Sequence, residues 1–219
     1  MLKETKNNFA ETIGNTPLIK LKLASEISGC NIYGKCEFLN PGGSVKDRPA
    51  KQIILDALET KIIEKGGTIV EGTAGNTGIG LSLVGNSLDM KSIIVMPKTQ
   101  SNEKKKMLKL CGAKLHLVEA VPYKNPGNYV RYSETLSKKI KNPCGVLWAN
   151  QFDNLSNKKS HYLSTGPEIW SQLDGRIDAF ICSVGTGGTL AGMSEYLKER
   201  NKKIIIGLAD PFGSAMFNF

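Results

Sequence analysis

The chain has 219 residues, of which 40% are hydrophobic and 22% charged, a composition that supports a buried core and excludes intrinsic disorder. No stretch of ~18 apolar residues is present and the first residues lack the apolar block of a secretory signal, so we predict no membrane span, no membrane partner and a cytosolic location. The net charge is +9, but the densest basic segment, 103–110, alternates lysines with apolar residues at helical spacing and has no aromatic residue to stack on bases. We therefore predict a solvated helix face there and no nucleic-acid partner.

Short apolar runs alternate with longer amphipathic segments, which is typical of βα units in a mostly parallel sheet flanked by helices. The predicted strands are 32–35, 68–70, 92–96, 114–118, 179–182 and 204–208. The predicted helices are 45–60, 77–86, 102–110, 129–139, 167–172 and 189–200. Residues 121–128 and 141–145 are predicted to be a loop and a turn, and Ser44 is the candidate N-cap of the first helix.

The cysteines and histidines point to neither a disulfide framework nor a metal site. Five cysteines are scattered without a CxxC pair, so we predict reduced thiols. His116 and His161 are far apart in the sequence and have no carboxylate-rich neighbourhood, so no metal site is predicted.

The stretch NPGGSVKDR, at 40–48, places Lys46 behind a glycine turn at the start of a predicted helix. Taken by itself, such a lysine is usually a solvated surface charge. Two further glycine-rich stretches, each between a predicted strand and a predicted helix, favour a different interpretation.

The first of these stretches is EGTAGNTG, at 71–78, where a helix is predicted to begin near Asn76. The second is SVGTGGTLAG, at 183–192, which holds Gly185, Thr186, Gly187, Gly188 and Thr189. Free amides at a helix start and the positive end of the helix dipole suit an anion, and the threonine hydroxyls of the second stretch add donors that fit a phosphate monoester. For either loop taken singly, a tight connection that binds nothing is an equal alternative.

A nicotinamide-nucleotide site is another alternative for the second loop. Asp210 ends the next predicted strand, roughly where a ribose-binding acid would lie. Leu190 replaces the third glycine of the dinucleotide fingerprint, which argues against this alternative.

Loops that follow separate strands of an open α/β sheet can converge on one crevice. An amine between two anion sites would suit a ligand that has an aldehyde for the amine, and a phosphate and a carboxylate for the two loops. Pyridoxal 5'-phosphate (PLP) with an amino acid fits this description.

At these residues the chain resembles the fold-type II PLP enzymes of the cysteine synthase (O-acetylserine sulfhydrylase) and cystathionine β-synthase family. The similar blocks, in order, are TIGNTPLIKL (12–21), KCEFLNPGGSVKDR (35–48), GTAGNTGIGL (72–81), MPKTQSNEKKKMLKLCGA (96–113), NQFDN (150–154), STGPEIW (164–170) and GTGGTLAG (185–192). The resemblance implies a tryptophan synthase β-like α/β fold of two lobes, each with a mostly parallel sheet flanked by helices, and a homodimer. It places 1–42 in the large lobe, 43–149 in a smaller substrate-loop lobe, and 150–219 in the large PLP-phosphate lobe.

The resemblance also implies roles for single residues. Lys46 would form the Schiff base with PLP and move the Cα proton of the substrate, and Asn76 would hydrogen-bond the phenolic oxygen of PLP. Gly185, Thr186, Gly187, Gly188 and Thr189 would hold the phosphate. The substrate carboxylate would be bound by Thr73, Ala74, Gly75, Thr77 and Gln151.

The implied reaction is PLP-dependent β-replacement, which forms L-cysteine from O-acetylserine and sulfide. Ala74 stands where many relatives have serine and Gln100 where many have methionine, so cystathionine β-synthase and cysteine desulfhydrase activities stay open. The family usually continues well past ADPFGSA, at 209–215. We therefore expect a fragment or truncated gene product whose apolar end, 211–219, is exposed, and a non-catalytic PLP-binding or partner-binding relative is a further alternative.

Overall fold

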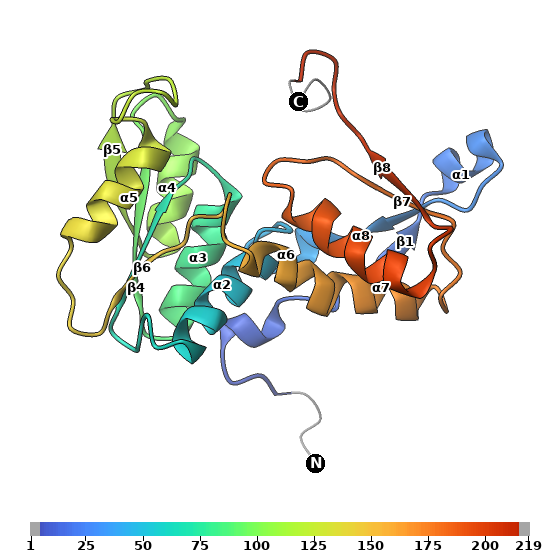
Figure 1. Cartoon of the computed structure of the whole chain (residues 1–219), viewed down its shortest axis with the longest axis horizontal. Helices are drawn as coiled ribbons and strands as arrows, with labels where there is room; N and C mark the ends of the chain where they lie inside the picture. Colours follow the sequence, from blue (N-terminus) through green and yellow to red (C-terminus); the bar gives the residue numbers. More distant parts are fainter. Residues whose placement is uncertain (1–4, 215–219) are drawn as a thin grey trace.

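The computed structural model describes residues 5–214. Its elements form two groups, one on each side of the helices α2 (Asp47–Glu59) and α6 (Ser156–Ser160) (Figure 1). Each group contains one of the two predicted anion loops, so the helices between the groups fix how those loops lie relative to Lys46.

The first group is built on a four-stranded parallel sheet with the strand order β5-β4-β3-β6. The strands are β3 (Thr68–Gly72), β4 (Lys91–Pro97), β5 (Ala113–Val118) and β6 (Val146–Trp148). The connecting helices are α3 (Asn76–Ser87), α4 (Asn102–Leu110) and α5 (Tyr129–Lys139). Every residue of β3 is buried, as expected for a central strand of a parallel sheet covered on both faces.

The second group is built on smaller sheets. The strands β7 (Ala179–Cys182) and β8 (Ile205–Leu208) pair in parallel, and β1 (Leu18–Lys20) pairs antiparallel with β2 (Tyr33–Lys35). The helices are α1 (Lys22–Ser28), α7 (Gly166–Gln172) and α8 (Gly188–Arg200), and a π-helix, His161–Thr165, joins α6 to α7. Short 3₁₀ turns lie at Phe9–Thr12 and Glu37–Leu39.

Each group has its own apolar core. In the first, Ile53 and Ile54 of α2 pack with Leu81 of α3 and Ile69 of β3. In the second, Met193 and Leu197 of α8 pack with Ile169 of α7 and with Ile204. The helix α2 packs on α3 through Gly80, where an added Cβ would lie 3.0 Å from the Cβ of Ala50. This close approach sets the position of the start of α2.

All six predicted strands and all six predicted helices are present, with shifts only at their ends. Ser44 is not the N-cap of α2, which begins at Asp47 with Lys46 in the N-cap position. Residues 44–46 form a turn instead, in which the Ser44 hydroxyl accepts the Lys46 amide at 3.2 Å. The elements not predicted are β1, α1, β6, α6, the π-helix and the two 3₁₀ turns.

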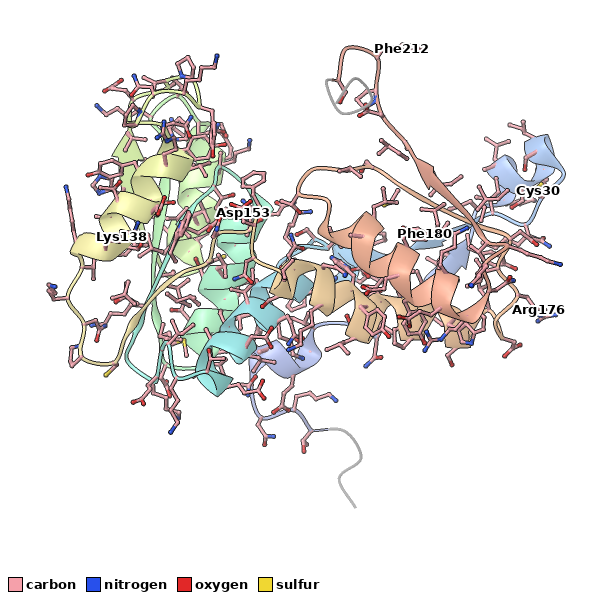
Figure 2. The ribbon with its side chains drawn as sticks, viewed as in Figure 1. Cys30, Lys138, Asp153, Arg176, Phe180 and Phe212 are labelled. Carbon is pink, nitrogen blue, oxygen red and sulfur yellow. The ribbon has the colours of Figure 1, made fainter. Side chains whose placement is uncertain are left out.

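The segment after β8 carries Phe212 away from the helices, and this side chain is fully exposed (Figure 2). The rest of the predicted apolar end, 215–219, lies outside the described residues. Among residues 5–214, no helix combines the length and the apolar character needed to cross a membrane.

Candidate active site

Lys46 lies in the wall of a large cleft and not in bulk water. The cleft has a volume of about 1380 Å³, and its lining includes Lys46, residues 185–187 and Thr189. Burial lowers the pKa of the Lys46 amine below its ordinary value, while the neighbouring Cys182 thiol opposes this shift. The amine is therefore biased towards the neutral, nucleophilic form.

The loop 185–189 joins β7 to α8 and faces this cleft. Gly187 has φ +85°, a left-handed backbone that favours glycine, and α8 begins immediately after it at Gly188. A Cβ added to Gly185 or Gly187 would meet no atom within 4 Å. The amides of the first turn of α8 have no partner inside the helix, so the loop offers donors and open space to an anion.

The two threonine hydroxyls of this loop are each contacted from behind by the segment 156–165. Asn157 Nδ2 donates to Thr186 Oγ1 at 2.8 Å, and His161 Nε2 lies 3.2 Å from Thr189 Oγ1. His161 is 1% exposed, and burial together with the Arg48 charge lowers its pKa to about 3. The ring is therefore neutral at neutral pH.

The loop 73–77 follows β3, and the hydroxyls of both its threonines are bonded to protein groups. Thr77 Oγ1 donates to Gln151 Oε1 at 2.5 Å, and the Gly75 amide donates to Thr73 Oγ1 at 3.3 Å. Ala74 and Gly75 are half-buried, and Asn76 is exposed at the first position of α3. Among the described residues, 73–77 and Gln151 do not line the cleft that holds Lys46.

Asn157 connects the two loops. Its Nδ2 donates to the Gln151 carbonyl at 3.0 Å as well as to Thr186, and Gln151 is in turn bonded to Thr77. Asp153, in the same stretch of chain, lies between the two groups of elements (Figure 2). The structure therefore joins the predicted carboxylate loop to the predicted phosphate loop through Gln151 and Asn157, and the sequence had not singled out Asn157.

An ion network centres on the buried Arg48, two residues after Lys46. Arg48 is 2% exposed and bonds both carboxylate oxygens of Glu37, at 2.7 and 2.8 Å, and both of Glu168, at 2.7 and 2.8 Å. Lys35 adds an ion pair to Glu168 at 2.6 Å. Burial would raise the pKa of Glu168, but the hydrogen bonds from Arg48 and Lys35 outweigh it and lower the pKa to about 2. The network fastens the start of α2 to α7.

Glu71 is a second buried acid that sequence reasoning missed. It is 1% exposed, and its Oε2 has no hydrogen-bond partner among the described residues. Burial raises its pKa to about 8, although the hydrogen bonds donated by Gln151 and Asn150 act to lower the pKa. The carboxyl is therefore mostly protonated at neutral pH, next to the side chain that accepts from Thr77.

The donor set fits PLP. A primary amine with a lowered pKa suits covalent capture of an aldehyde, and a glycine turn at a helix start with two hydroxyls suits a phosphate monoester. Both face the same cleft, which is larger than the ~300–1,000 Å³ of typical ligand pockets.

Comparison with known proteins agrees with this donor set. Residues 9–218 match a family described as "Pyridoxal-phosphate dependent enzyme". Cysteine synthase 1 of Neurospora crassa is 50% identical over 208 residues, which make up 94% of this chain and 54% of that protein. Cystathionine beta-synthase of Saccharomyces cerevisiae is 40% identical over 222 residues, 97% of this chain and 43% of that protein. The chain spans about half the length of the curated relatives it matches.

Solved structures give the same result. O-ureido-L-serine synthase superposes with a TM-score of 0.89 and 34% identity, over 98% of this chain and 66% of that chain. A hydrogen sulfide-producing enzyme from Fusobacterium nucleatum has a TM-score of 0.85 and 35% identity, over 98% and 68%. The predicted fold class and the predicted resemblance are thereby confirmed: the chain belongs to the family of pyridoxal-phosphate dependent enzymes, alongside cysteine synthases and cystathionine β-synthases.

Proposed function

We propose that this chain carries the active site of a cysteine synthase, which forms L-cysteine and acetate from O-acetylserine and sulfide. The observation that carries the proposal is the shared cleft of Lys46 and the loop 185–189. The relatives named cysteine synthase, at 50% identity in Neurospora crassa and 46% in Dictyostelium discoideum, support the choice of reaction.

In this proposal Lys46 Nζ holds PLP covalently, and residues 185–189 hold its phosphate with backbone amides and the hydroxyls of Thr186 and Thr189. Asn76 donates to its phenolic oxygen. When bound, PLP supplies an electron sink for the charge left at the substrate Cα. Once the substrate amine had displaced it from the cofactor, the freed Lys46 amine, whose pKa is lowered, would take the Cα proton and return it after sulfide had replaced acetate at Cβ.

The carboxylate pocket is a separate part of the proposal, because its residues do not line the cleft. The first-turn amides of α3, with Thr73, Ala74, Gly75 and Thr77, would bind the substrate carboxylate at the positive end of the helix. Gln151 would hold the Thr77 hydroxyl in place, as its 2.5 Å hydrogen bond suggests.

Two alternatives have specific support. The relative named cystathionine beta-synthase favours a thiol as the incoming nucleophile, and the neighbour titled as a hydrogen sulfide-producing enzyme favours desulfhydration of cysteine. Supplying homocysteine with serine, or cysteine alone, in the same assay distinguishes these reactions from cysteine synthesis.

Three finer predictions belong to the same proposal. They are a homodimer, a cytosolic location, and a division into a lobe formed by 43–149 and a lobe formed by 1–42 with 150–219. Two separate apolar cores, one of which includes α2 and the other α7 and α8, support the division into two lobes.

The test is sulfide-dependent cysteine formation by the purified 219-residue chain supplied with PLP and O-acetylserine. The proposal predicts product with the parent chain, none with Lys46→Ala, and unchanged turnover with Lys65→Ala, an exposed lysine paired with Asp89. A folded parent chain that binds PLP but forms no cysteine would favour the non-catalytic relative instead.

A further inference from the structure

We infer that Asn157 is a positioning residue that turns the Thr186 hydroxyl towards the cleft and fastens the loop 185–189 to the segment that carries Gln151. The inference rests on the proposed phosphate site. It assigns to Asn157 a task that does not involve contact with substrate or cofactor.

The carboxamide of Asn157 is held on all sides. The residue is 4% exposed, and the two hydrogens of Nδ2 are directed to Thr186 Oγ1 at 2.8 Å and to the Gln151 carbonyl at 3.0 Å. Its Oδ1 packs on Gly188 so closely that an added Cβ there would collide with it. Both the position and the orientation of the amide are therefore fixed.

This orientation decides what the Thr186 hydroxyl can donate. A hydroxyl carries one hydrogen and two acceptor sites. Because Asn157 donates into the Thr186 oxygen, the hydroxyl hydrogen stays available to an anion in the cleft that Thr186 lines. A carboxylate in place of the amide would accept that hydrogen and turn it away from the cleft.

The same amide group relates the two loops to each other. Its second hydrogen bond holds the backbone of Gln151, whose side chain accepts from Thr77 in the first turn of α3. A displacement of Asn157 would therefore reach both anion loops, one directly and the other through Gln151.

The experiment measures the dissociation constants of PLP and of pyridoxal, which lacks the phosphate, from the apo chain by visible absorbance. The variants are Asn157→Asp, Thr186→Val, and the two combined. We expect Asn157→Asp to weaken the affinity for PLP by about 10- to 100-fold, which is the range for a hydrogen bond to a charged group. The affinity for pyridoxal should fall by less than about 2-fold. In the Thr186→Val background, Asn157→Asp should add less than about 3-fold, because the hydroxyl through which it acts is gone.

The control is Asn154→Asp, in the same turn, whose Nδ2 donates to the Ala149 carbonyl and whose Oδ1 accepts from the Ser156 amide; within residues 5–214 its side chain has no hydrogen bond to the loop 185–189. It should leave the affinity for PLP unchanged. The inference is overturned if Asn157→Asp binds PLP as tightly as the parent does, or if it weakens the affinity for pyridoxal as much as the affinity for PLP. It is also overturned if Asn157→Asp lowers the affinity for PLP by the same factor with and without the Thr186 hydroxyl.

A second pair of variants decides the matter if Asn157→Asp does not fold. Thr186→Ser keeps the hydroxyl and should keep the affinity for PLP, while Thr186→Val should lose about 10-fold. Equal affinities would overturn the inference. None of these measurements needs turnover, so a chain that makes no cysteine leaves the inference standing, whereas a parent chain that binds no PLP overturns both.

Discussion

The two glycine loops of this chain have the same sequence pattern but different surroundings. The loop 73–77 follows β3, a fully buried strand with a parallel neighbour on each side, and its threonine hydroxyls bond to neighbouring protein groups. The loop 185–189 follows β7, which has β8 as its neighbour in a two-stranded sheet and is partly exposed, and it faces the cleft. A strand, a glycine turn and a helix thus supply free amides in both loops. The packing around each loop decides whether that loop is open to a ligand.

The largest effect is expected where the two groups of elements are fastened together. Arg48→Met should lower the free energy of unfolding by about 3–5 kcal/mol, because it leaves the half-buried Glu37 without its cation and leaves Glu168 with Lys35 alone. Denaturant unfolding measures this. Arg176→Met is the matched control, since Arg176 pairs with Asp174 at the surface and should change stability by less than about 1 kcal/mol. Equal losses in the two variants would show that the network does not fasten α2 to α7.

Glycine-to-alanine changes compare the end of β3, which precedes the loop 73–77, with the open loop 185–189. Gly72→Ala would place a Cβ 2.6 Å from backbone atoms of Tyr129 and Val130 and should cost about 1–3 kcal/mol. A methyl group added by Gly185→Ala meets no atom within 4 Å and should change the stability of the apo chain by less than about 0.5 kcal/mol, yet weaken PLP binding, since it would take up open space in the loop that lines the proposed phosphate site. Thermal unfolding measures the stability of both variants, and a PLP titration measures the binding to Gly185→Ala. A Gly72→Ala chain as stable as the parent would contradict the close packing of β3 on α5.

A pH series tests the buried carboxyl of Glu71, which lies in β3 of the first group of elements. The pKa of Glu71 is raised by burial from an ordinary 4.5 to about 8, so between these values the folded chain keeps a proton that the unfolded chain releases. Stability should therefore fall as pH rises through this window, and Glu71→Gln should remove that slope. Between pH 6 and 7 the free energy of unfolding of the parent should fall, relative to that of Glu71→Gln, by at most about 1.4 kcal/mol. Unfolding curves at both pH values measure it, with Glu119→Gln as an exposed control, and parallel curves for parent and Glu71→Gln would contradict the raised pKa.

Sequence patterns predicted the fold well where local signals are strong. The alternation of apolar runs and amphipathic segments placed β7, α4 and α5 at their observed bounds. The elements that were not predicted are short or lack such signals. The strands β1 and β6 have three residues each, and α1 has no side-chain cap at Leu21. Their existence depends on the neighbours they pack against, which no short window of sequence contains.

The candidate site was predictable in its loops but not in its supports. Glycines beside a strand end mark a helix start that can bind an anion, and so 73–77 and 185–189 could be found from the sequence. Asn157 and Glu71 have no such local signal, because their importance comes from residues 29 and 80 positions away, Thr186 and Gln151. Contacts between distant segments are a property of the folded chain.

Borohydride reduction of the chain mixed with PLP, followed by peptide mass analysis, tests whether the Lys46 amine and the loop 185–189 share one site. If they do, a single major pyridoxyl label is expected on Lys46, and that label should be lost when inorganic phosphate in excess occupies the loop. Label spread over surface lysines, or label on Lys46 that phosphate leaves unchanged, would contradict a shared site.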